Sequence, residues 1–146
     1  FSRRTKRLLG EFGFAWDSSD TAHDFRPYML RAGERARMNE PYERGDPTDI
    51  VEVPYVWHRD DWMQLFPVVS GPEWVAYSTE SAVFDRWTEE FRWMHENVEN
   101  GVYTLLLHPQ CAGRAPFLTR LEAFVEEVAS MEETEFATVG SVAATF

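Results

Sequence analysis

An almost wholly apolar run that ends on a histidine is the feature of this sequence that most constrains its fold. Residues 101–107 read Gly-Val-Tyr-Thr-Leu-Leu-Leu, and His108 and Pro109 follow at once. Apolar runs of this length are typical of strands buried on both faces, as in parallel sheets and barrels. A titratable side chain at the C-terminal end of such a strand lies where α/β barrels place their chemistry. His108 is therefore the first candidate functional residue, and the alternative is a core histidine satisfied by a backbone carbonyl.

The rest of the chain predicts helices that alternate with strands. Apolar residues at helical spacing predict two amphipathic helices, over 81–99 and 117–128. The other expected elements are a helix over 3–12 closed near Gly13, strands at 14–16, 50–57 and 136–139, a polar flap over 31–49, an aromatic-rich loop over 60–72, and a closing helix or tail over 141–146. This α/β alternation fits part of a distorted (β/α) barrel, within a single domain over residues 1–146.

Charge and cysteine content restrict the partners and the compartment. The chain has 146 residues and a net charge of -11, so nucleic acid and anionic membranes would repel it and neither is expected as a partner. The single cysteine, Cys111, excludes an internal disulfide and fits a reducing compartment, which predicts a cytoplasmic location. No motif supports Cys111 as a nucleophile.

Three segments resemble motifs of the polysaccharide deacetylase superfamily, which comprises carbohydrate esterase family 4 and its relatives. The segment from His108 to Arg114, His-Pro-Gln-Cys-Ala-Gly-Arg, resembles the last catalytic motif. Residues 14–28 resemble the stretch after the third motif, and residues 50–62, which end Asp-Asp-Trp, resemble the fourth. The sequence around His108 is similar to that of the branch with Helicobacter-type peptidoglycan deacetylase, metal-dependent allantoinase and cyclic imide hydrolase.

The resemblance implies a divalent metal, expected to be zinc, that is held by an Asp-Asp pair and a His-x-x-x-His motif. Neither motif occurs here, and the four histidines (His23, His58, His95 and His108) are far apart in the sequence. We therefore expect no metal ligand within this chain and a metal bound by residues outside it. The chain opens on Phe1 without a methionine. It is expected to be the C-terminal portion of such a barrel, cleaved, split or partly resolved, with the missing N-terminal half as its partner.

For the site residues, the resemblance implies that His108 acts as the general acid. It would stabilise the tetrahedral intermediate and protonate the leaving nitrogen, and an imidazole suits this because its ordinary pKa lies near neutrality. Asp60 and Asp61 match the motif whose acid orients a catalytic partner, and the alternative is a solvated pair in a loop.

Three further residues are candidates for substrate binding. Trp57 and Trp62 would wall the pocket, with simple packing as the alternative. Arg114 would bind a substrate oxygen, and the alternative is a structural ion pair at the base of the following helix.

These observations predict part of a metal-dependent hydrolase of non-peptide C–N bonds, to which the chain supplies the general acid and the pocket walls. The substrate would be a small cyclic amide or imide, or an N-acetylated sugar, and no activity is expected without the missing N-terminal motifs. The alternatives are a non-catalytic structural or binding module and a metal-free degenerate member of the family. The family branch also implies a homo-oligomer, a tetramer.

Overall fold

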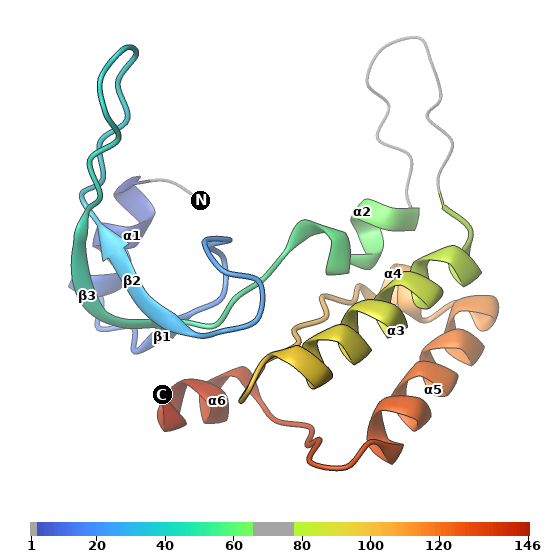
Figure 1. Ribbon diagram of the computed structural model, residues 1–146. Helices are drawn as coiled ribbons and strands as arrows, with labels where there is room; N and C mark the ends of the chain where they lie inside the picture. The colour runs from blue at the N-terminus through green and yellow to red at the C-terminus, as the bar shows by residue number, and fades with distance from the viewer. Residues whose placement is uncertain (1–2, 66–77) are drawn as a thin grey trace, which may run out of the picture. The chain divides into compact units, whose positions relative to one another are not determined.

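A three-stranded sheet and a group of helices make up the computed structural model, which describes residues 3–65 and 78–146 (Figure 1). The chain divides into two units, and we call Phe1–Tyr55 with Ala137–Phe146 the sheet unit and Val56–Phe136 the helical unit. The predicted α/β class is confirmed. The single domain over residues 1–146 stays a prediction. Among the described residues, no helix has the length and apolar character needed to cross a membrane.

The sheet unit holds β1 (Trp16–Asp17), β2 (Tyr28–Ala32) and β3 (Asp46–Glu52) in the order β1-β3-β2. Strand β3 pairs in parallel with β1 and antiparallel with β2, so that Asp17 lies opposite Glu52. Two helices belong to this unit, α1 (Arg3–Glu11) and α6 (Val139–Thr145). Gly13, just beyond α1, has a φ of 72°, the left-handed conformation that favours glycine after a helix end.

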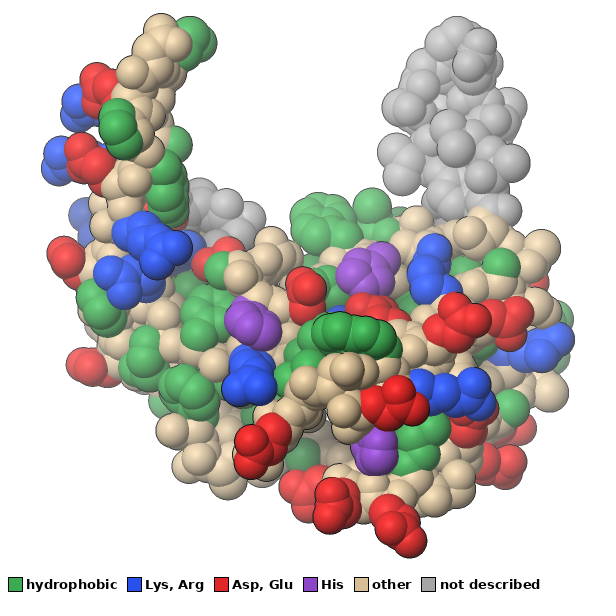
Figure 2. Space-filling view, viewed as in Figure 1, with side chains coloured by type: hydrophobic (Ala, Val, Ile, Leu, Met, Phe, Trp, Pro, Cys, Tyr) green, Lys and Arg blue, Asp and Glu red, His purple; other side chains and the backbone are tan. Residues whose placement is uncertain are grey.

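The polar stretch over 31–49 forms the connection between β2 and β3 and parts of both strands. The segment after β2 and the segment before β3 continue past the sheet as a hairpin, with an antiparallel bridge between Arg35 and Glu43. Figure 2 shows basic and acidic side chains interspersed along this hairpin. Arg37 and Glu40, for example, lie 3.3 Å apart. Strand β3 ends at Glu52, earlier than predicted, because Pro54 has no N–H to donate to a ladder.

The helical unit contains η1 (Trp57–Arg59), α2 (Asp61–Leu65), α3 (Glu80–Asn97), α4 (Pro109–Ala112) and α5 (Ala115–Ser130). Helices α3 and α5 are the two amphipathic helices that the sequence predicts. Their apolar faces pack together, and the rings of Phe84 and Phe117 meet edge to face with centroids 4.8 Å apart. Trp87, between them in the core, is fully buried.

Three predicted elements are wrong. Residues 101–107 are extended but form no strand, because among the described residues their backbone pairs at one isolated bridge, Leu106 with Asp60. The expected strand over 136–139 is absent; the Thr138 hydroxyl accepts a hydrogen bond from Ser141 N–H, and α6 begins there. The expected loop over 60–72 contains α2, and residues 66–72 lie outside the described part of the chain.

Candidate active site

Asp61 and His108, 47 positions apart in the sequence, form a hydrogen-bonded pair. Nδ1 of the His108 ring lies 2.7 Å from Asp61 Oδ1, and the His108 backbone N–H donates to Asp61 Oδ2 at 2.9 Å. A carboxylate has only acceptor oxygens, so Nδ1 carries the proton in this contact. The neutral ring then has an unprotonated Nε2, which can exchange a proton with a bound molecule. The His108 side chain is 35% exposed, whereas that of Asp61 is fully buried.

The backbone brings this pair together at the single bridge between the two segments. Leu106 N–H donates to Arg59 O at 3.0 Å, and Asp61 N–H donates to Leu106 O at 3.1 Å. Beyond the bridge, Asp61 opens α2 and His108 is the N-cap of α4. Pro109 follows at the first position of α4, where a missing N–H costs no helical hydrogen bond. The His-Pro pair in the sequence is thus a helix start that presents the imidazole.

Asp60 has a different role from Asp61. Its Oδ1 accepts hydrogen bonds from the backbone N–H groups of Trp62 at 2.9 Å and Met63 at 3.3 Å, so it caps α2. The same oxygen lies 3.7 Å from His108 Nδ1. The exposed fractions are 7% for Asp60 and 0% for Asp61, so the two are not a solvated loop pair. Asp61 is the carboxylate that orients the ring.

The three predicted substrate-binding residues differ in their relation to His108. The Trp62 ring centroid lies 5.6 Å from that of His108, and Trp62 is 42% exposed. Trp57 opens η1 and is also exposed. Arg114 is the N-cap residue of α5, and its Nε donates to the Gln110 carbonyl at 3.0 Å. Trp62 therefore lies beside the imidazole, and pocket roles for Trp57, Trp62 and Arg114 stay predictions.

Cys111 lies in the first turn after His108 but is unsuited to nucleophilic attack. The side chain is buried. Burial raises the pKa of the Cys111 thiol, and the negative charges of Asp61 and Asp60 raise it further. The reactive form of cysteine is the thiolate, so this residue is a small buried side chain of α4.

An ionic network that sequence reasoning missed lies next to the pair, with Arg59 fully buried and Glu90 partly buried. Glu90 of α3 accepts hydrogen bonds through Oε1 from Arg59 Nη2 at 2.6 Å and through Oε2 from the Tyr103 hydroxyl at 3.1 Å. The Arg59 guanidinium, fully buried, lies 4.3 Å from the centre of the Tyr103 ring. Burial opposes the charge on Glu90, but the contacts with Arg59 and His58 outweigh it and hold its pKa below the ordinary value. The network is therefore charged.

Asp60, Asp61 and His108 are also the group of described residues that could ligate a metal, because one possible ligand atom of each lies within 4.8 Å of the others. The contacts argue against this use. Asp61 accepts from the ring and the backbone of His108, and Asp60 accepts from two N–H groups of α2. Atoms that already accept N–H hydrogen bonds at 2.7–3.3 Å fit an acid pair with a helix cap better than a metal site. We assign no metal to them.

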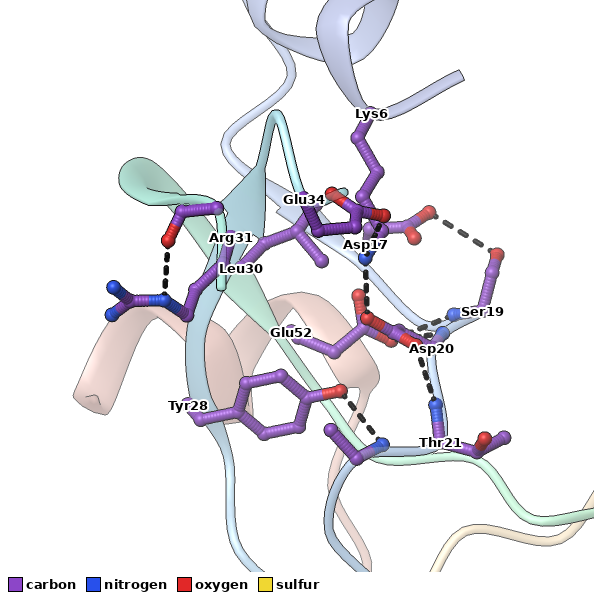
Figure 3. A network of polar contacts seen from close by, with 12 residues as sticks. Lys6, Asp17, Ser19, Asp20, Thr21, Tyr28, Leu30, Arg31, Glu34 and Glu52 are labelled. Atoms are coloured by element: carbon purple, nitrogen blue, oxygen red, sulfur yellow. Dashed lines mark hydrogen bonds and ion pairs between the residues drawn. The ribbon is translucent and has the colours of Figure 1, made fainter. Parts of the chain in front are cut away.

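A second polar cluster lies in the sheet unit, and Figure 3 shows the Glu52 carboxyl group pointing at the backbone of residues 19–20. Glu52 is fully buried, and its Oε1 accepts from the N–H groups of Ser19 at 2.7 Å and Asp20 at 2.8 Å. Lys6 of α1 pairs with Asp20 at 2.9 Å. Neither Glu52 Oε2 nor the buried Asp17 Oδ2 receives a hydrogen bond from any described donor.

Comparison with known proteins shows similarity to peptidoglycan deacetylases. No family model matches the chain. It is 27% identical to the peptidoglycan deacetylase of Helicobacter pylori over 156 residues, which cover 100% of this chain and 53% of that protein. It is 25% identical over 139 residues to a peptidoglycan deacetylase-like protein of Gibberella zeae, covering 83% of this chain and 40% of the relative. The chain spans about half the length of these relatives.

Solved structures agree in fold. The crystal structure of a polysaccharide deacetylase from Mycobacterium smegmatis superimposes with a TM-score of 0.75 at 28% identity, covering 99% of this chain and 45% of that one. An allantoinase superimposes with a TM-score of 0.70 over 99% of this chain and 42% of that one, at 20% identity. The expected fold, part of a deacetylase-type barrel, is thus confirmed. This chain is therefore similar in sequence and fold to members of the polysaccharide deacetylase superfamily, over part of their length.

Proposed function

We propose that this chain supplies the general acid for hydrolysis of a non-peptide C–N bond. The observation that carries the proposal is the buried Asp61 carboxylate 2.7 Å from Nδ1 of a partly exposed His108. The names of the similar proteins, peptidoglycan deacetylases and an allantoinase, support C–N bond hydrolysis.

The geometry supports Nε2 of His108 as the atom that transfers the proton. Since Nδ1–H is engaged with Asp61, the proton that moves is held at Nε2 of the imidazolium form. When a tetrahedral intermediate collapses, Nε2–H donates this proton to the departing nitrogen and the C–N bond breaks. Asp61 keeps the ring orientation constant and stabilises the imidazolium, as the buried acid of a catalytic triad does. Such a proton transfer is worth roughly 10²–10⁴-fold in rate.

The substrate proposal follows from the family branch and from Trp62. A small cyclic amide or imide is the first candidate, and an N-acetylated sugar is the second. Trp62, which is 42% exposed and lies next to His108, suits either, because both a flat ring and a sugar ring pack on indole.

The remaining parts of the catalytic machinery are proposed to lie outside this chain. A divalent metal, expected to be zinc, would be held by an N-terminal segment of the same protein, which is also the proposed partner. A cytoplasmic location and a homotetramer remain predictions.

The test is turnover by the whole protein, made from the chain together with any segment encoded before it. His108→Ala should lower kcat on cyclic imides, ureides or N-acetylated sugars by at least roughly 10²-fold, with the metal content unchanged. His95→Ala is the control, since His95 Nε2 lies 2.8 Å from the Glu132 carbonyl and takes no part in the pair. Full activity in His108→Ala would refute the acid role. Absence of turnover on all three substrate classes would favour the non-catalytic binding module.

A further inference from the structure

Glu90 is the acceptor at which three segments of the helical unit meet. Its Oε1 accepts from Arg59 Nη2 at 2.6 Å and Nε at 3.1 Å, and lies 2.7 Å from His58 Nε2. Its Oε2 accepts from the Tyr103 hydroxyl at 3.1 Å. Both carboxylate oxygens are therefore engaged, one with the segment that leads to Asp61 and the other with the segment that leads to His108.

Two partners of Glu90, Arg59 and Tyr103, lie shortly before the two members of the acid pair in the sequence. Arg59 stands two residues before Asp61, and Tyr103 stands five residues before His108. The guanidinium of Arg59 lies 4.3 Å from the Tyr103 ring centre, so the two segments also contact each other through these side chains. A second anchor lies one turn away on α3, where Trp87 Nε1 donates to the His58 carbonyl at 2.7 Å.

The backbone alone gives these segments little support. Within residues 3–65 and 78–146, they share one isolated bridge, with two hydrogen bonds, rather than a ladder. A functional contact has to be held to within about 0.5 Å by packing and by second hydrogen bonds. An arginine that is fully buried keeps its place only if its charge is paired, and Glu90 pairs it.

We propose that Glu90 is a positioning residue for the Asp61–His108 pair, acting through Arg59 on one side and Tyr103 on the other. The inference rests on the proposed function for its catalytic meaning, but its structural content can be tested without turnover. Removal of the Glu90 carboxylate leaves the two segments joined by the single backbone bridge and the Arg59–Tyr103 contact, so the 2.7 Å contact between Asp61 Oδ1 and His108 Nδ1 loosens.

The experiment is imidazole NMR on the ¹⁵N-labelled full chain. In the unaltered protein, His108 should show one tautomer, with Nδ1 protonated and protected from exchange with water. In Glu90→Ala, we expect a mixture of tautomers and an exchange of the Nδ1 proton that is faster by roughly tenfold or more. Glu89→Ala removes an exposed carboxylate from the adjacent position of α3 and should leave both signals unchanged.

Two milder variants keep the test decisive if Glu90→Ala does not fold. Glu90→Gln keeps the shape and removes the charge opposite Arg59. Tyr103→Phe keeps the ring beside Arg59 and removes the hydroxyl that reaches both Glu90 Oε2 and the Trp87 carbonyl. Each should accelerate the Nδ1 exchange by less than the alanine variant. If the folded variants have the tautomer and exchange rate of the unaltered protein, Glu90 is only structural and the inference is overturned.

The failure of this inference is distinct from failure of the proposed function. If Glu90→Ala changes the His108 signals but His108→Ala keeps full turnover, the positioning role stands and the acid role falls. If His108→Ala is inactive but the His108 signals are insensitive to Glu90, the acid role stands and the positioning role falls.

Discussion

Asp61 accepts two hydrogen bonds from His108, one from the ring Nδ1 at 2.7 Å and one from the backbone N–H at 2.9 Å. The second bond fixes the carboxylate to the same residue whose ring it orients. Rotation of the ring breaks the hydrogen bond from Nδ1. The hydrogen bond from the backbone N–H keeps Asp61 in place, so the ring contact can form again. This arrangement holds Nε2 in one direction, which is what a proton donor to a bound substrate needs.

Asp61→Asn is expected to reduce turnover far more than it reduces stability. The asparagine amide can donate to Nδ1, which favours the tautomer with the proton on Nε2 and removes the charge that stabilises imidazolium. By analogy with the buried aspartate of serine proteases, we expect kcat to fall by roughly 10³–10⁴-fold. Turnover of the whole protein on its best substrate measures this.

Asp60→Asn is the matched control for that variant. Asparagine keeps a side-chain oxygen that can accept from Trp62 N–H and Met63 N–H, so the cap of α2 survives. We expect a loss in kcat of less than roughly tenfold, since the ring contact belongs to Asp61. Equal losses of kcat in Asp60→Asn and Asp61→Asn would contradict the separate roles assigned to these carboxylates.

Asp60→Ala should instead lower stability. The substitution leaves the N–H groups at the start of α2 without their side-chain acceptor. Loss of an N-cap of this kind costs about 1 kcal/mol of free energy of unfolding. Urea denaturation followed by tryptophan fluorescence measures the loss, and a midpoint equal to that of Asp60→Asn would show that the cap carries no stability.

The parts of the fold that could be predicted from the sequence are those with a local signal. Helices α3 and α5 show the apolar period of 3.6 residues, and His108 stands out because it interrupts an apolar run. Residues 101–107 carry the signal of a buried strand, but a strand needs neighbours to pair with. Here the segment packs against a helix instead: the Tyr103 ring lies edge to face against Phe91 of α3, with ring centroids 5.4 Å apart.

The finer parts of the candidate site depend on tertiary contacts that leave no trace in the sequence. Nothing local tells Asp60 from Asp61, because the register of the bridge to Leu106 decides which carboxylate meets His108. In the sequence, Glu90 is one more acid on a helix that is rich in charge, and its pairing with the fully buried Arg59 follows only from the tertiary structure. Glu90 is three residues from the buried Trp87, and this spacing places both on one helix face. The spacing is the one sequence signal that could have indicated an inward-facing Glu90.

Two glycine substitutions should differ in their effect on the stability of the sheet unit. A Cβ at Gly45 would lie 2.2 Å from the backbone oxygen of Ala32, so Gly45→Ala forces β2 and β3 apart at the base of the hairpin. A Cβ at Gly10 in α1 meets nothing within 4 Å, and alanine favours a helix over glycine by about 1 kcal/mol.

Thermal unfolding of the two variants compares them directly. We expect Gly45→Ala to lower the melting temperature and Gly10→Ala to raise it or leave it unchanged. A Gly45→Ala protein as stable as the unaltered chain would show that the hairpin base relaxes without cost.

Glu52 should make the stability of the sheet unit depend on pH. Burial raises the pKa of Glu52 from its ordinary value of 4.5 to about 8; the N–H groups of Asp20 and Ser19 lower it in part, and the charge of Asp17 raises it. The folded state thus keeps a proton that the unfolded chain releases. The contribution of Glu52 to stability is full below pH 4.5 and is lost as the pH rises to about 8. Protonated Glu52 would donate to Asp17 Oδ2, which no other described donor reaches.

Glu52→Gln tests this directly. Its oxygen can accept from the N–H groups of Ser19 and Asp20, and its amide N–H₂ can donate to Asp17 at every pH. We therefore expect the variant to be as stable as the unaltered protein at pH 5 and more stable at pH 8.5, with a flatter profile between them. Asp20→Asn, which alters the pair with Lys6 but not the buried carboxyl, should keep the original slope. Parallel profiles for Glu52→Gln and the unaltered protein would show that Glu52 binds no extra proton in the folded state.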